Sequence, residues 1–236
     1  MLLPAPYRRI YFHHIRRVGG TSLNQSFFAL ATNQPGRMSA RLRRSKTRVL
    51  RLHGLLFVGA NKSVLEGGDY FYGFSHIPAH QLRLPNETFT IAIFRDPVAR
   101  VLSHYTMLLT HAQLKHQRPF FAVEKQWLGG SLRDFLTAMP QERLLAQLFA
   151  FSAAFDIREA AARIAECSAI FSTEHYDAGL RYLATVTHLP LASRHSHRSR
   201  LCTTVSDSTM RLLKRFVEPE RELLSLLRSG SNARGL

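Results

Sequence analysis

Thr88-Phe89-Thr90-Ile91-Ala92-Ile93-Phe94, followed at once by Arg95-Asp96-Pro97, is the stretch that decides the fold of this chain. Its residues are almost all apolar or β-branched, which is typical of a strand buried on both faces of a parallel sheet. Pro97 suits the first turn of a helix, and apolar residues then recur at helical spacing over 98–111. The stretch therefore predicts a buried parallel strand whose carboxyl end runs directly into a helix.

The beginning of the chain has the same plan. The β-rich residues 8–15 predict a first strand, Arg16-Arg17-Val18-Gly19-Gly20-Thr21-Ser22 a loop, and 23–32 a helix. A glycine turn before a helix exposes backbone N–H groups at the positive end of the helix dipole, which binds anions. The loop lacks the GxxxxGK[ST] pattern of nucleoside triphosphatases. An ordinary glycine turn with a Thr or Ser cap is the alternative.

The remaining segments alternate between strands and helices. Further strands are expected at 48–52, 70–74 and 169–172, and helices at 132–139, 141–151, 157–166, 177–187, 207–217 and 219–227. The basic stretch 33–47 is expected to form a surface loop or a frayed helix, and Ser229 onward a loose tail. This alternation predicts one α/β domain over residues 1–236, with its core over about 8–227, around a parallel sheet.

Positive charge dominates the composition. The chain has 32 Lys+Arg against 16 Asp+Glu and a formal net charge of +16, and 27 of the cations are Arg. Since Arg binds phosphate and carboxylate groups bidentately, this balance favours a protein that handles an anion: nucleic acid, a membrane surface, a nucleotide cofactor or an acidic substrate. A genome rich in Arg codons is the alternative. The hydrophobic fraction of 45% excludes wholesale disorder.

Other protein classes are disfavoured by what the sequence lacks. Cys167 and Cys202 are far apart without CxxC spacing, which argues against a disulfide scaffold or a cysteine zinc site. No apolar run approaches the roughly 18–20 residues that cross a bilayer, and no signal peptide is visible. A cytoplasmic protein is therefore expected. His76 and His80 have i, i+4 spacing, but Pro78 lies between them, so no metal site is predicted.

The segment after the decisive strand also points to an anion. Arg95 leaves the carboxyl end of a buried strand, where ligands gather in open α/β sheets, and Ser103 lies on the following helix. Both side chains are expected to converge on one phosphate. The alternative is a turn in which Arg95 and Asp96 close on each other.

These segments together resemble the Golgi-type carbohydrate sulfotransferases, the heparan sulfate 2-O- and chondroitin-type family with its bacterial relatives. Residues 16–22 resemble part of its His-Ile-Pro-Lys-Thr-Gly-Gly-Thr-Ser loop, and 95–105 resemble its Arg-Asp-Pro-Val-x-Arg-x-x-Ser-x-Tyr segment. Residues 74–78 are similar to its Gly-His segment, and 170–177 to its Thr-Glu turn. The resemblance covers about 8–190 and implies a three-layer α/β domain of the P-loop nucleotide-binding type.

The resemblance also implies a reaction and a set of site residues. The sulfuryl donor would be PAPS (3′-phosphoadenosine 5′-phosphosulfate), with PAP as product and no metal. Its 5′-phosphosulfate would lie on Arg16, Arg17, Gly19, Gly20, Thr21 and Ser22, and its 3′-phosphate on Arg95 and Ser103. His76 would be the base that deprotonates an acceptor hydroxyl, expected on a carbohydrate or another small molecule.

Departures from the family pattern leave alternatives open. Arg17 stands where the family has a Lys that donates to the oxygen bridging sulfur and phosphorus, and its planar guanidinium is no simple substitute for an ammonium group. A protein that binds PAP or PAPS without catalysis is one alternative. A basic nucleic-acid-binding protein is another, although no helix-turn-helix, zinc-finger or RNP1 pattern is present. The basic loop 195–200 could cover a nucleotide or stay solvated.

Overall fold

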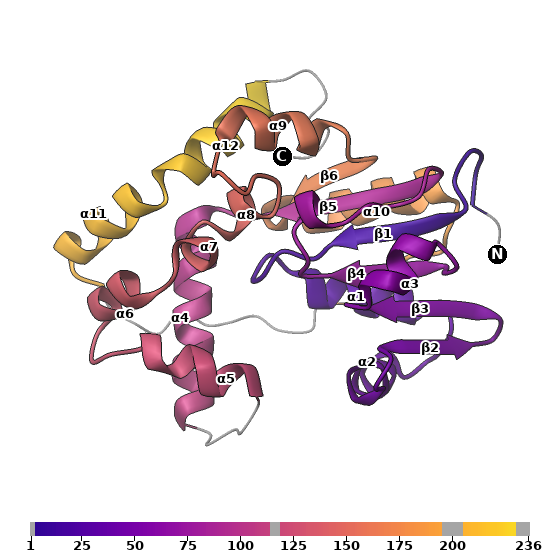
Figure 1. The fold of residues 1–236 in the computed structure, drawn as a ribbon, viewed down its shortest axis with the longest axis horizontal. Coiled ribbons are helices and arrows are strands. Elements are labelled where there is room, and N and C mark those ends of the chain that lie inside the picture. The colour runs from indigo at the N-terminus through magenta and orange to yellow at the C-terminus, as the bar shows by residue number, and fades with distance from the viewer. Residues whose placement is uncertain (1–2, 114–118, 195–204, 230–236) are drawn as a thin grey trace.

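Six strands form one sheet in the order β2-β3-β4-β1-β5-β6 (Figure 1). The computed structural model describes residues 3–113, 119–194 and 205–229, and these contain β1 Arg9–His13, β2 Val49–Leu52, β3 Leu55–Gly59, β4 Tyr72–Ser75, β5 Thr88–Phe94 and β6 Ala169–Ser172. The decisive strand has the predicted bounds because its apolar run is confined by turn residues on both sides. It lies inside the sheet between β1 and β6.

The sheet is parallel from β3 to β6, as expected for the centre of an α/β domain. The predicted parallel sheet is confirmed for its five central and far-edge strands, and one further strand, β2, pairs antiparallel with β3 at the other edge. No strand was expected at Leu55–Gly59. A two-residue turn, His53-Gly54, joins the two strands, and both residues have positive φ (47° and 78°). That conformation favours a tight hairpin over a crossover connection.

The helices connect and cover the strands. The described residues form α1 Gly20–Phe28, α2 Pro35–Arg44, α3 Lys62–Gly67, α4 Pro97–Gln113, α5 Pro119–Glu124, α6 Leu132–Ala138, α7 Gln141–Leu144, α8 Ala146–Phe149, α9 Ile157–Ala165, α10 Tyr176–Thr187, α11 Asp207–Phe216 and α12 Glu218–Ser229. Single turns of 3₁₀ helix lie at η1 Ala79–Gln81, η2 Lys125–Trp127 and η3 Thr173–His175. None of these helices is both long and apolar enough to cross a membrane.

Helices cover both faces of the sheet and complete a three-layer arrangement (Figure 1). On one face Phe27 of α1 stacks on Tyr72 of β4, with ring centroids 4.1 Å apart. On the other face Phe151, just after α8, packs against Phe94 of β5, and α9 and α12 lie beyond it. The central strands carry apolar side chains on both faces because helices cover both faces of the sheet.

Two predicted helical regions need correction. The stretch 33–47, expected as a loop or frayed helix, contains the ordered helix α2, because Met38 and Leu42 are buried in the main core. The predicted helix 141–151 is divided into α7 and α8 by Leu145, whose backbone (φ −106°, ψ 46°) is not helical. Ser229, expected to begin a loose tail, is the last residue of α12, and 230–236 lie outside the described residues.

Candidate functional site

The motif residues lie at the ends of adjacent strands. β4, β1, β5 and β6 are neighbours and run parallel, so their carboxyl ends meet at one edge of the sheet. His76 follows β4, the glycine loop follows β1, and Arg95 follows β5. Thr173, from the turn after β6, is next to the loop: a Cβ on Gly19 would be 2.9 Å from its Cγ2 atom. The strand order thus assembles segments that are up to about 150 residues apart in the sequence.

The glycine loop opens α1 toward this edge. Gly19 has φ 81° and is the N-cap residue, with no side-chain hydrogen bond to the helix and no acidic residue in the first turn. Gly20 follows as the first helical residue, and a Cβ there would collide with the ring of His14. Thr21 is exposed, and Ser22 donates its backbone N–H to the Gly19 carbonyl at 3.0 Å. The first turn of α1, which has no acidic residue of its own, therefore presents the positive end of the helix dipole at this edge.

Two guanidinium groups lie close to each other beside the loop. Arg17 donates to Ser103 Oγ from Nη2 (2.7 Å) and Nε (3.2 Å). Arg95 Nη1 donates to the backbone carbonyl of Arg17 at 3.2 Å. Burial, and then the neighbouring charge of Arg95, lower the pKa of Arg17 to about 10. Like charges held this close favour an anion between or beside them.

The acidic side chains near Arg95, those of Asp96 and Glu174, accept hydrogen bonds from backbone N–H groups. Asp96 Oδ1 accepts the N–H of Ala99 at 2.8 Å and thereby caps α4. Glu174, from the turn after β6, accepts the N–H of Asp96 at 3.1 Å. Both carboxylates raise the pKa of Arg95, against the larger lowering by burial. Among the described residues, Arg95 has no ion pair with Asp96, so the self-closing turn considered above does not form.

Arg16 points to a different partner from Arg17. Its Nη1 atom is 2.6 Å from Glu124 Oε1 on α5. Glu124 is 3% exposed, and its other oxygen is 3.1 Å from His104 Nε2 on α4. Arg16, predicted to bind the cofactor, thus holds the loop to α5. The sequence analysis did not identify Glu124, because no local pattern connects residues more than 100 positions apart.

The orientation of His76 is fixed by its own hydrogen bond. Its Nδ1 atom is hydrogen-bonded to the backbone carbonyl of His14, and a carbonyl only accepts, so Nδ1 carries the proton and Nε2 has the free electron pair. Ser75 shapes the turn, since its hydroxyl accepts the Ile77 N–H at 3.1 Å. Surrounding protein atoms, and then the Arg16 charge, lower the pKa of His76 to about 4. The imidazole is therefore neutral at pH 7.

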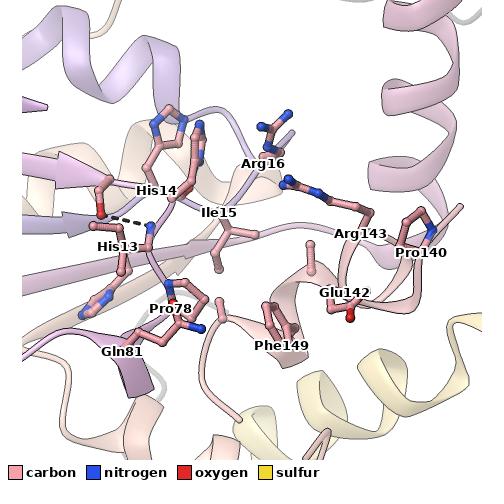
Figure 2. Close-up of a pocket in the computed structure, with 15 residues that line it drawn as sticks. His13, His14, Ile15, Arg16, Pro78, Gln81, Pro140, Glu142, Arg143 and Phe149 are labelled. Atoms are coloured by element: carbon pink, nitrogen blue, oxygen red, sulfur yellow. Dashed lines mark hydrogen bonds between the residues drawn. The ribbon is translucent and has the colours of Figure 1, made fainter. Parts of the chain in front are cut away.

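A pocket of about 370 Å³ adjoins His76 (Figure 2). His14, Arg16 and His76 form one side, and Pro140, Arg143 and Phe149 belong to the opposite side, on α7 and α8. Figure 2 shows the guanidinium groups of Arg16 and Arg143 near each other, and the Arg143 charge lowers the pKa of Arg16. The volume is within the range of small-molecule sites, about 300–1,000 Å³. A neutral imidazole, two cations and an apolar wall thus face one cavity.

Three further features considered in the sequence are a metal site, the basic loop 195–200 and the cluster of cations on and after α2. Within the described residues, no group of three or more His, Cys, Asp or Glu side chains is placed to hold a metal ion. The basic loop 195–200 lies outside the described part of the chain. On and after α2, Arg37, Arg41, Arg43, Arg44, Lys46, Arg48 and Arg51 are all exposed. These cations lie at the β2 edge of the sheet, away from the four strand ends (Figure 1).

No known protein family matches this chain, and no curated protein is significantly similar to it in sequence.

Proposed function

We propose that this protein is a sulfotransferase that transfers the sulfuryl group of PAPS to an acceptor hydroxyl. The resemblance implies that the acceptor is a carbohydrate. One observation carries the proposal: the N-terminal turn of α1, the Arg17–Arg95 pair and the neutral His76 lie at one edge of the sheet. The strand, glycine loop and helix at the centre of that sheet support a fold of the P-loop nucleotide-binding type.

The residues present suit a donor with two anionic groups. The turn at Gly19–Ser22 offers backbone N–H groups and hydroxyls for the 5′-phosphosulfate. Arg95 and the buried Ser103, eight residues further along the chain on α4, offer a charged and a neutral donor for the 3′-phosphate. The nearby carboxylates of Asp96 and Glu174 each accept a backbone N–H group and also attract the charge of Arg95.

PAPS supplies an activated sulfuryl group whose transfer breaks the bond between sulfur and the bridging phosphate oxygen. His76 Nε2 would accept the proton of the attacking hydroxyl, because the His14 carbonyl holds the proton on Nδ1 and the residue is exposed at the site. Arg17 would donate to the oxygen on which negative charge develops, once its guanidinium turns from Ser103. The pocket beside His76 holds and orients the acceptor.

A specific observation favours a second candidate, a protein that binds PAP without transferring sulfate. Two of the three guanidinium nitrogens of Arg17, Nε and Nη2, donate to Ser103, on the side proposed for the 3′-phosphate. If Arg17 stays there when the donor binds, the bridging oxygen lacks its donor and transfer is slow. Binding would then survive without turnover.

Calorimetric titration with PAP, together with transfer of ³⁵S-sulfate from PAPS to a panel of sugars and phenols, separates these functions. Saturable PAP binding with transfer supports the enzyme, and PAP binding without transfer supports the second candidate. Absence of PAP binding, with salt-dependent binding of DNA or RNA, would overturn both and favour the exposed α2 cations as the functional surface.

A further inference from the structure

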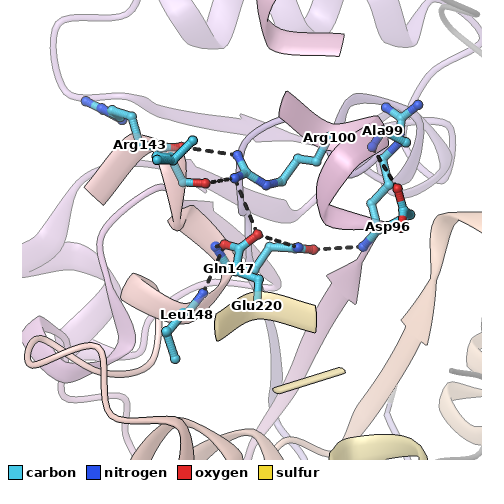
Figure 3. Close-up of polar contacts among 9 residues, drawn as sticks. Asp96, Ala99, Arg100, Arg143, Gln147, Leu148 and Glu220 are labelled. Atoms are coloured by element: carbon cyan, nitrogen blue, oxygen red, sulfur yellow. Dashed lines mark hydrogen bonds and ion pairs between the residues drawn. The ribbon is translucent and has the colours of Figure 1, made fainter. Parts of the chain in front are cut away.

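A buried polar network, shown in Figure 3, is hydrogen-bonded to the backbone N–H of Arg95. It consists of Arg100 on α4, Gln147 on α8 and Glu220 on α12, whose side chains are 1%, 0% and 0% exposed. Arg100 belongs to the Arg-Asp-Pro segment of the sequence, but its side chain points into the protein and not toward the glycine loop. Its Nη2 atom is 3.4 Å from Glu220 Oε2.

The hydrogen bonds are all donated in one direction, from the end of β5 through Gln147 to Glu220 on α12. Glu220 Oε1 accepts the backbone N–H of Gln147 at 2.6 Å, and Oε2 accepts the side-chain Nε2 of Gln147 at 3.0 Å. Gln147 Oε1 then accepts the backbone N–H of Arg95 at 2.8 Å. The orientation of the Gln147 amide is determined by its neighbours, because a carboxylate cannot donate and a backbone N–H cannot accept.

Arg100 closes the network on its other side. Its Nη1 donates to the carbonyl of Arg143 at 3.2 Å, and its Nη2 is hydrogen-bonded to the carbonyl of Leu144. The carboxylate of Glu220 is therefore held by a cation from α4 and by three N–H groups from α8, which are the backbone and side-chain amides of Gln147 and the backbone amide of Leu148. Net stabilisation alone is a poor explanation of such a group, since well-packed apolar residues often replace a buried ion pair without loss of stability.

We propose that Gln147, held by Glu220 and Arg100, is a positioning residue that fixes the backbone of Arg95 and so keeps its guanidinium beside Arg17. The effect on anion binding rests on the proposed function above. The contact between Gln147 and Glu220 thereby sets how well the anion site is organised before a ligand arrives. A misplaced Arg95 would still carry its charge but would meet a phosphate with poorer geometry.

Gln147→Met tests the proposal, because Met has a similar shape and no hydrogen-bond acceptor of comparable strength. Leu223→Ala is the matched control: Leu223 is fully buried on the same helix α12, and its truncation weakens the docking of α12 without removing a network contact. Two measurements are made on both variants: hydrogen exchange of the Arg95 amide by NMR, and PAP affinity by calorimetry.

In the wild type, the Arg95 amide should exchange slowly, as a buried hydrogen-bonded N–H does. In Gln147→Met this amide should exchange faster than its neighbours in β5, and PAP affinity should fall roughly tenfold, the loss typical of one hydrogen bond. Leu223→Ala should lower the unfolding midpoint at least as much, yet leave PAP affinity within about threefold of wild type.

Each other outcome is decisive. Unchanged exchange at Arg95 in Gln147→Met overturns the positioning role, whether or not PAP binds. Fast exchange at Arg95 in the wild type overturns it even where Gln147→Met does not fold. An equal loss of PAP affinity in Leu223→Ala shows that loss of stability alone is responsible. If the wild type does not bind PAP, the proposed function fails, and the exchange data still decide whether Gln147 fixes Arg95.

Discussion

Arg95→Ala separates anion binding from the stability of the fold. In the free protein, the Arg95 side chain donates a 3.2 Å hydrogen bond to the Arg17 carbonyl, beside the like charge of Arg17. Removing the side chain loses that bond and the attraction of Glu174 and Asp96, but it also relieves the burial of a charge and the repulsion by Arg17. Because these effects oppose each other, the free energy of unfolding without ligand should change by less than about 1 kcal/mol.

The ligand-bound state should respond much more strongly. Loss of a charge-assisted phosphate contact costs about 1.5–3 kcal/mol of binding free energy, which raises the Kd for PAP by roughly 10–150-fold. At a PAP concentration of about 100 times the wild-type Kd, the ligand stabilises the wild type by about 2.7 kcal/mol. At that same concentration the variant should gain only about 0.3–1.3 kcal/mol.

Urea unfolding with and without PAP measures both quantities. Arg37→Ala is the matched control, since it removes the same charge from the exposed face of α2. The control should keep the full ligand-induced stabilisation. If Arg95→Ala keeps it as well, Arg95 does not contact a phosphate of PAP, and the convergence of Arg95 with the glycine loop has a purely structural role.

Arg17→Ala should lower turnover by more than it raises the PAPS dissociation constant, because charge develops on the leaving oxygen in the transition state. Unchanged turnover would show that Arg17 does not reach that oxygen. Faster turnover in Arg17→Lys would show that an ammonium group fits better. His76→Ala should cost about 10²–10⁴-fold in turnover at unchanged PAP affinity. The pKa of His76, lowered to about 4, places the acidic limb of the wild-type kcat/KM profile well below pH 6.5, and persistence of that limb in the variant would contradict the assignment. Burial lowers the pKa of His13 from 6.5 to about 4, so the unfolded state binds more protons in this range, and stability should be complete above pH 6.5 and decline as the pH falls toward 4. Urea unfolding at pH 7 and pH 5 should show a smaller decline in His13→Gln than in the wild type, and an equal decline would refute the origin in His13.

The elements that sequence reasoning located well are those determined by local composition. β5 and β6 have the predicted bounds, because a short apolar or β-branched run between turn residues has few other stable conformations. The helix that begins at Pro97 was also expected, since an α-helix accepts proline readily only in its first turn. The antiparallel edge was missed: it depends on the positive φ values of His53 and Gly54, and His53 gives little sign of that conformation.

The same division holds for the candidate site. Arg95 and the glycine loop were identified because each follows a predicted strand, and His76 because its segment resembles one of the sulfotransferase family; parallel strands bring their carboxyl ends to one edge. Their individual environments were not accessible in this way. The proton on Nδ1 of His76 depends on the His14 carbonyl, which follows the neighbouring strand. The orientation of the Arg16 side chain depends on its hydrogen bond to Glu124 of a distant helix.

The sequence by itself determined the strand-to-helix turns, the excess of cations and the residue types that meet at the turns. Only the tertiary structure decided which of these residues touch. Strand order places β1 between β4 and β5, and the packing of α12 on α8 brings Glu220 to Gln147 across 73 positions. The physical reason is that local segments encode their own backbone conformation, whereas contacts between segments arise from the burial of apolar surface over the whole chain.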